Sequence, residues 1–199
     1  MTIVRATLEL INAAKSNDIH GVRLAIKNGA NAGMFNDRAL KYAVDNCNLL
    51  MVKTLFYAGA DIHADNEFCL RRACENSDLE MVEFLLSVAA KIHAKDDYCL
   101  KCAAEMNNPE MLALLIYYGA DVHAENNYAL KIAAKNGYLD IVKKLINSGA
   151  NVNVDKSYPL RAAFESGHMD VVQLLIQYRA DISSIDENLL RPAIKNYRQ

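Results

Sequence analysis

The chain has 199 residues, of which just over half are apolar, and its formal net charge is −2. This composition is typical of an ordered protein, and the small net charge provides no overall attraction to nucleic acid or to anionic membranes. No apolar run approaches the roughly 20 residues that a membrane-spanning helix needs. The cysteines number five, an odd count, which favours a reducing intracellular compartment, either cytoplasmic or nuclear.

The elements expected along the chain recur with a period of 30 residues. Every step is the same length, so the pattern contains no insertion and no deletion. Such a period indicates a repeat architecture. Three columns show it: Leu at 10, 40, 70, 100, 130, 160 and 190; Ala at 13, 43, 73, 103, 133, 163 and 193; and a second Ala at 30, 60, 90, 120, 150 and 180.

Each unit predicts a helix, a turn, a second helix and a loop. In 121–150, for example, Leu130 and Ala133 stand at helical spacing, and Ile141 and Leu145 do so again after a short break. One such helix pair cannot bury its apolar face alone, so the pairs must stack on their neighbours. We therefore expect an all-α solenoid forming a single array over 1–199, with an N-terminal capping pair at 1–30, internal repeats at 31–60, 61–90, 91–120, 121–150 and 151–180, and a C-terminal half repeat at 181–199.

Residues at the expected helix ends support these boundaries. Asn108 precedes Pro109, which is the order preferred for a helix N-cap and the first helical position. Asp18, Asn48 and Asp78 stand in the same phase as Asn108. Glycines are expected in the left-handed conformation that ends the second helices, at 29, 59, 119 and 149.

At these residues the chain resembles the ankyrin repeat family. The resemblance is carried by the segments GADIHA at 59–64 and GADVHA at 119–124, by the turn Asn136-Gly137 and by DIVKKL at 140–145. The family repeat has about 33 residues, so the loop between Ala124 and Leu130 is shortened. We expect a tight loop there in place of the family's projecting hairpin. The shortened form is similar to arrays that are abundant in large DNA viruses.

The resemblance implies a non-catalytic scaffold or adaptor that binds a partner protein on the concave face of the array. We expect no enzyme activity, no cofactor, no metal site and no nucleic-acid or membrane partner, and we expect a monomer. If the chain is viral, its compartment is the host cell. An alternative function, dependent on a thiol or a metal, would use Cys99 and Cys102, which have C-x-x-C spacing.

Three periodic columns could be mistaken for binding sites. His63, His93 and His123 lie one repeat apart, too far to share a zinc ion, so we interpret them as loop residues that bond backbone across neighbouring repeats. A basic column, which includes Lys41, has acids four residues before and after it, so we expect pairing within the helix face. An aromatic column is interpreted as filling the space left by the shortened loop; it comprises Phe68, Tyr98, Tyr128 and Tyr158.

The predicted contact face consists of the loop tips and one stripe of the first helices, since residues four apart share a helix face. Its charge changes from negative in 61–90 to positive in 121–150. Met106 is the expected apolar anchor. The predicted contact residues are Asp65, Glu67, Arg71, Glu75, Lys95, Asp97, Lys101, Glu105, Met106, Glu125, Lys131 and Lys135. The rival surface is on the second helices, at Phe84, Leu114 and Tyr117.

Overall fold

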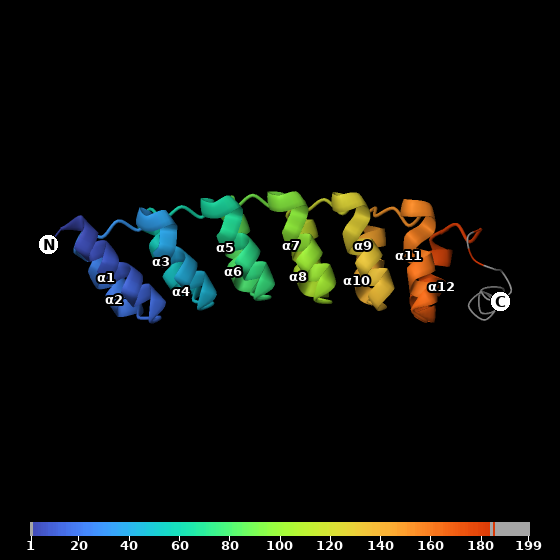
Figure 1. Cartoon of the computed structure of the whole chain (residues 1–199), viewed down its shortest axis with the longest axis horizontal. Helices are drawn as coiled ribbons and strands as arrows, with labels where there is room; N and C mark the ends of the chain where they lie inside the picture. The colour runs from blue at the N-terminus through green and yellow to red at the C-terminus, as the bar shows by residue number, and fades with distance from the viewer. Residues whose placement is uncertain (1, 184, 186–199) are drawn as a thin grey trace. The chain divides into compact units, whose positions relative to one another are not determined.

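The computed structural model describes residues 2–183 and 185, and within these residues the regular secondary structure is helical throughout, without a strand (Figure 1). This part of the chain contains twelve helices, so the predicted all-α fold class is confirmed. The helices are α1 (Ile3–Lys15), α2 (Ile19–Lys27), α3 (Met34–Asp45), α4 (Leu49–Tyr57), α5 (Ala64–Glu75), α6 (Leu79–Ser87), α7 (Ala94–Glu105), α8 (Pro109–Tyr117), α9 (Ala124–Asn136), α10 (Leu139–Asn147), α11 (Val154–Glu165) and α12 (Met169–Gln177).

The helices belong to two compact units, residues 1–95 and 96–199. In the first unit, α1 packs on α2 and α3, α3 packs on α4 and α5, and α5 packs on α6. In the second unit, α9 packs on α10 and α11, and α11 packs on α12. Each pair formed by an odd-numbered and an even-numbered helix falls within one predicted repeat, whereas most of the predicted half repeat 181–199 lies outside the described residues. We call the odd-numbered helices first helices and the even-numbered ones second helices.

The periodic apolar columns form the core of each unit. The leucines from Leu10 to Leu160 are all buried, and so are the alanines from Ala43 to Ala163. Small alanine side chains allow neighbouring helices to approach closely, while the leucines fill the space between them. Leu190 and Ala193 continue the pattern outside the described residues.

The turns between paired helices have the expected caps. The side chains of Asp18, Asn48, Asp78 and Asn108 each accept a hydrogen bond from a backbone N–H in the first turn of the following helix, and Pro109 occupies the first turn of α8. The left-handed glycines are confirmed as well, because Gly29, Gly59, Gly119 and Gly149 have φ angles of 87° to 95°. Both ends of the second helices therefore follow from local sequence.

The shortened loops contain a structure that was not predicted. Near the start of each first helix from α3 to α11, directly after its first residue, three successive residues adopt left-handed backbone angles, with φ from 47° to 59°, and none of them is glycine. This conformation costs about 1–2 kcal/mol per residue for an L-amino acid, so other contacts must stabilise it. The tight loop that we expected is thus a left-handed turn, formed by residues 35–37, 65–67, 95–97, 125–127 and 155–157.

Candidate partner-binding surface

The left-handed turns and the exposed sides of the first helices form one kind of surface in both units, which we call the first-helix face. In three of the five turns, at Asp37, Asp97 and Asn127, the side chain of the third residue bonds the next repeat and anchors the turn. Asp37 Oδ1 accepts a hydrogen bond of 2.7 Å from the backbone N–H of Asp61, one repeat later. Asn127 Oδ1 accepts an equivalent bond of 2.8 Å from the N–H of Asn151. The anchor side chain thereby joins one turn to the start of the next loop.

These anchors are buried, which corrects part of the predicted contact face. Glu67 is 2% exposed and Asp97 is 5% exposed, so neither can contact a partner. The prediction of one exposed stripe through 37, 41 and 45 and their equivalents was wrong because the left-handed turn rotates its third residue inward, away from the helix face. Burial also raises the pKa of Asp37 above its ordinary value, although the bond from the Asp61 N–H opposes the shift.

The histidine column bonds within its own repeat. His63 Nδ1 lies 2.7 Å from Glu67 Oε1, and His123 Nδ1 lies 3.3 Å from Asn127 Oδ1. For His63 and His123 the expectation of a bond to the backbone of a neighbouring repeat was therefore wrong; next to His123, the anchor residue Asn127 makes that bond. Asn153 stands in the same phase as the histidines, and its Oδ1 does accept a bond of 2.7 Å from the backbone N–H of Asp181.

Lysines of the basic column bridge successive repeats instead of pairing four residues away. Lys101 Nζ lies 3.2 Å from Glu125 Oε2, and Lys131 Nζ lies 3.1 Å from Asp155 Oδ2. Lys41 pairs in the same way with Asp65. For these three lysines the expected pairing within the helix face was wrong, and the residue four positions earlier is the buried anchor Asp37, Asp97 or Asn127. The charges are nevertheless neutralised, by the first residue of the next turn.

Asparagines strengthen two of these bridges. Asn36 Nδ2 donates to both carboxylate oxygens of Asp65 at 3.0 Å, and Asn126 Nδ2 donates to Asp155 at 2.9 Å. The bonds from Asn36 and Lys41 lower the pKa of Asp65, and the bonds from Lys131 and Asn126 lower the pKa of Asp155. Both carboxylates are therefore held in the charged form.

Arg71 and Arg161, the arginines of the basic column within the described residues, bond the left-handed turn of their own repeat. Arg71 donates to the carbonyl oxygens of Asn66 at 3.0 Å and Asp65 at 3.1 Å. Arg161 donates to the carbonyls of Lys156 and Asp155 at 3.3 and 3.2 Å. In these repeats the position that elsewhere holds the bridging acid is occupied by a residue without a carboxylate, Lys95 or Ile185. Within the basic column, the lysines therefore bridge successive repeats, whereas Arg71 and Arg161 bond the turn of their own repeat.

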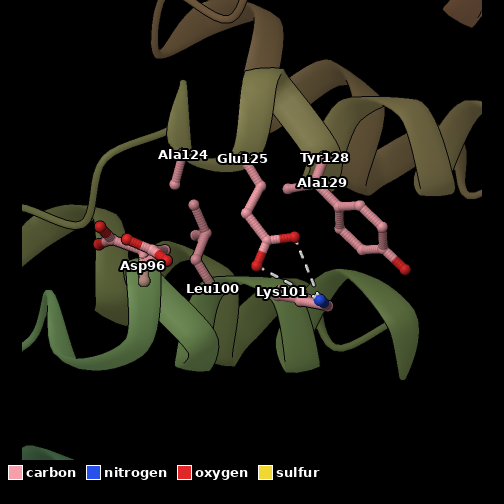
Figure 2. A pocket seen from close by; sticks show the side chains of 8 residues that line it. Asp96, Leu100, Lys101, Ala124, Glu125, Tyr128 and Ala129 are labelled. Atoms are coloured by element: carbon pink, nitrogen blue, oxygen red, sulfur yellow. Dashed lines mark hydrogen bonds and ion pairs between the residues drawn. The ribbon is translucent and has the colours of Figure 1, made fainter.

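The aromatic column lies beside these cations and is half-buried. Lys101 Nζ lies 4.5 Å from the centroid of the Tyr128 ring, within the range of a cation–π contact. Figure 2 shows Lys101 between Glu125, to which it is bonded, and this ring. Tyr128 Oη also donates a hydrogen bond of 2.6 Å to Glu105 Oε1, which raises the pKa of Tyr128 to about 12.

Other predicted contact residues lie at the surface. Met106, at the end of the α7 region, is 49% exposed, and Lys95 and Lys135 are exposed as well. Glu75 pairs with Arg72 Nη1 at 3.1 Å. On the rival surface, Tyr117 is 83% exposed, whereas Phe84 and Leu114 are half-buried. Exposure alone therefore does not decide between the two surfaces.

Two hollows lie on the first-helix face of the second unit. The hollow between α7 and α9 is small, and the Lys101–Glu125 pair closes much of it (Figure 2). The hollow between α9 and α11, which we call the α9–α11 groove, is wider. It is lined by Tyr128, Lys131, Ile132, Lys135, Asp155 and Tyr158. Ile132 was not predicted to contribute, although its half-exposed apolar side chain stands where other repeats have Tyr42, Arg72 or Cys102.

The two cysteines that a thiol-dependent function would use are buried. Cys99 and Cys102 lie in α7 and are 1% and 6% exposed. Burial also raises the pKa of Cys69 to about 12. Within residues 2–183 and 185, no group of three or more His, Cys, Asp or Glu side chains could hold a metal ion. No helix in the described part of the chain is both long enough and apolar enough to cross a membrane.

Comparison with known proteins identifies the repeats. Residues 100–186 match the sequence model of the family described as ankyrin repeats in three copies. The fold is similar to that of an ankyrin repeat domain from Acinetobacter baumannii, with a TM-score of 0.75 and 28% identity over 86% of this chain and 98% of that one. It is also similar to the ankyrin repeat domain of Bcl-3, a member of the IκB protein family, with a TM-score of 0.75 and 26% identity over 88% and 87% of the two chains. No curated protein sequence matches the chain. The predicted ankyrin repeats are therefore confirmed within residues 100–186, and the similarity of fold extends over most of the chain.

Proposed function

We propose that this chain, whose residues 100–186 are ankyrin repeats, is a non-catalytic scaffold that binds a partner protein on its first-helix face. Ankyrin repeat domains are generally protein–protein interaction modules, and the corresponding face is the concave one in repeat arrays of this kind. We further propose that the protein works as a monomer in the cytoplasm or nucleus. The viral setting stays a prediction from the 30-residue repeat.

The observation that carries this proposal is the pre-organisation of the first-helix face. Its charged and aromatic side chains are held by bonds such as Lys131–Asp155 at 3.1 Å and Tyr128–Glu105 at 2.6 Å. A surface whose side chains are already ordered loses less conformational entropy when it binds. On the rival surface, the ring of Tyr117 packs edge-on against that of Tyr118 and has no bond to a charged group among the described residues, whereas Lys53 Nζ lies 5.1 Å from the ring centroid of Phe84.

The burial of Glu67 and Asp97 changes the charge that a partner would meet. Without Glu67, the contact face in 61–90, which was predicted to be negative, keeps only the acids Asp65 and Glu75. The basic region in the second unit is unaffected. We retain as proposed contacts the residues that reach the surface, namely Asp65, Arg71, Glu75, Lys95, Lys101, Glu105, Met106, Glu125, Lys131 and Lys135.

The proposal can be tested with one substitution on each surface. The partner is first captured from a cell lysate by the full chain and identified, and its Kd is then measured by calorimetry. We expect Ile132→Asp, in the α9–α11 groove, to weaken binding at least about tenfold, because it places a charge on an apolar contact. Tyr117→Ala should change the Kd less than about twofold, since a residue outside an interface contributes little.

The opposite result, loss with Tyr117→Ala and full binding by Ile132→Asp, would move the site to the second helices. Circular dichroism and thermal melting show whether each variant is folded. If Ile132→Asp lowers the melting temperature, the milder Ile132→Ala decides the question.

A further inference from the structure

The hydrogen bond between Tyr128 and Glu105 joins two neighbouring first helices, and at the next junction between first helices this contact is incomplete. Glu105, at the end of α7, accepts a hydrogen bond of 2.6 Å from the phenol of Tyr128 in α9. The repeat geometry places the last acid of one first helix beside the aromatic residue of the next. At this junction the chain provides both the donor and the carboxylate.

One repeat later the carboxylate is missing. The residues at the equivalent positions are Lys135 and Tyr158. Lysine has no acceptor, so it cannot receive the phenol proton of Tyr158. Within the described residues the structure gives Tyr158 Oη no hydrogen-bond acceptor. Among the internal repeats of 31–180, Lys135 is also the exception in its column, because the other four positions carry the acids Asp45, Glu75, Glu105 and Glu165.

The same junction carries an excess of positive charge. Lys131 is bonded to Asp155, so these two charges compensate each other. Lys135 is exposed and makes no ion pair within the described residues. The guanidinium of Arg161 lies 5.9 Å from the centroid of the Tyr158 ring. The α9–α11 groove therefore combines an unmatched cation, a phenol donor and the apolar side chain of Ile132.

We infer that the α9–α11 groove binds an acidic, extended segment of the partner protein through a Glu or Asp side chain. The carboxylate accepts a hydrogen bond from Tyr158 Oη and pairs with Lys135, so the partner supplies the group that Glu105 supplies at the preceding junction. A neighbouring apolar side chain of the segment packs on Ile132. Hydrogen bonds to a charged group are stronger than neutral ones, and this gives the site its preference for an acid. The inference rests on the proposed function and specifies the partner's chemistry.

The test uses the full chain and a defined probe, a fluorescein-labelled hexapeptide of alternating glutamate and leucine with blocked ends. Binding is followed by fluorescence anisotropy. The control peptide has glutamine in place of glutamate. We expect the glutamate peptide to bind and the glutamine peptide to bind at least about tenfold more weakly, because the carboxylate provides the main recognition. Absence of binding by the glutamate peptide would overturn the inference.

Two substitutions test the named contacts. Lys135→Glu restores the acid found at this position in other repeats, so it should offer Tyr158 a carboxylate within the chain and reduce peptide affinity at least about tenfold. Tyr158→Phe, which removes only the donor, should reduce affinity at least about fivefold. If Tyr158→Phe binds as well as the wild type, the phenol has no part in recognition and the inference is wrong.

A matched variant separates this site from general electrostatics. Lys143→Glu makes the same charge change at an exposed position on α10 and should leave the affinity within about twofold of the wild type. An equal loss in Lys143→Glu and Lys135→Glu would contradict a specific site. Competition by millimolar inorganic phosphate would indicate a phosphate ligand, which also contradicts the inference. If the peptide fails while Ile132→Asp still abolishes binding of the native partner, the proposed function stands and only the acidic recognition is rejected.

Discussion

The anchor residue accepts the same kind of backbone hydrogen bond in three of the left-handed turns, but it is an aspartate in two of them and an asparagine in the third. Asp37, Asp97 and Asn127 each accept a backbone hydrogen bond from the next repeat, of 2.7, 2.9 and 2.8 Å. An aspartate must bury a charge to do so, whereas an asparagine needs none. This difference makes the anchor a place where stability depends on pH.

We predict that Asp37→Asn stabilises the protein at neutral pH. Burial raises the pKa of Asp37 above the ordinary 3.8, so the folded state holds its proton more tightly than the unfolded state. The stability linked to that proton is complete below the ordinary pKa and is lost as the pH rises through the raised pKa. Asparagine does not titrate, so its contribution to stability does not fall over this pH range, and its side-chain oxygen still accepts the hydrogen bond from the Asp61 N–H. Urea unfolding should therefore give a higher midpoint for the variant at pH 7.

The stabilisation by Asp37→Asn should become smaller as the pH falls toward 3.8, because the protonated aspartate of the wild type also carries no charge. Asp37→Ala is the matched control. It removes the acceptor and leaves a buried N–H without a partner, which should cost about 1–3 kcal/mol at either pH. Equal midpoints for Asp37→Asn and the wild type at pH 7 would show that the buried charge costs nothing.

The phenol of Tyr128 provides a direct measure of the contact between repeats. Its pKa is raised to about 12 mainly by the hydrogen bond to Glu105. We predict that Glu105→Gln returns this pKa toward 10.0, as followed by NMR of the ring carbon bonded to oxygen. The linked stability is complete below pH 10 and is lost as the pH rises through about 12. Glu165→Gln, an equivalent change in α11, should leave the Tyr128 signal unchanged; a shift as large as that of Glu105→Gln would mean that the bond is not its cause.

The left-handed turn is the element that distinguishes these repeats. It places three non-glycine residues with positive φ in succession near the start of each first helix from α3 to α11. Arg161 and Arg71 bond the exposed carbonyls of two such turns, and the buried anchors fix the third residue. These contacts offset the conformational cost of the turn, which is about 1–2 kcal/mol per residue.

The turn predicts an unusual response to glycine. Lys156 has a φ of 57° and an exposed side chain, so Lys156→Gly should relieve strain and offset the added entropy of the unfolded chain, leaving stability equal or higher. Lys156→Val should lower stability by about 1 kcal/mol or more, because branched residues tolerate this conformation poorly. Lys143→Gly, in the middle of α10, should cost about 1 kcal/mol. Equal losses for the two glycine variants in urea unfolding would contradict a left-handed backbone at 156.

The helices and their ends were predictable, but the turns were not. Apolar spacing and caps such as Asn108-Pro109 are local signals, and the structure confirms them. The turn depends on an anchor that bonds a residue 24 positions later, which no local pattern reveals. The asparagines at 36, 66 and 126 were the available signal, since asparagine tolerates positive φ better than most residues. The lysine bridges, which also span 24 positions, were missed for the same reason.

At the scale of the molecule, a residue that departs from the 30-residue pattern marks a repeat whose surface differs from that of its neighbours. A position that is acidic in four of the five internal repeats and basic in one, as at Lys135, stands out only when the repeats are aligned. The predicted contact list contained Lys135 and Lys131 because of their charge, yet it missed Ile132, whose exposure depends on how α9 and α11 pack. The list also contained Glu67 and Asp97, whose burial follows from the turn geometry. The sequence shows which of the predicted contact residues are charged, but only the folded structure shows which of them are accessible to a partner.

The central claim, that the first-helix face binds the partner, is tested most directly by hydrogen–deuterium exchange of the full chain with and without its captured partner. We predict slower exchange in the peptides that cover α9 and α11, Ala124–Asn136 and Val154–Glu165, when the partner is bound. Exchange in α10 and α12, Leu139–Asn147 and Met169–Gln177, should change little. Protection confined to the second helices, with α9 and α11 unaffected, would contradict the account.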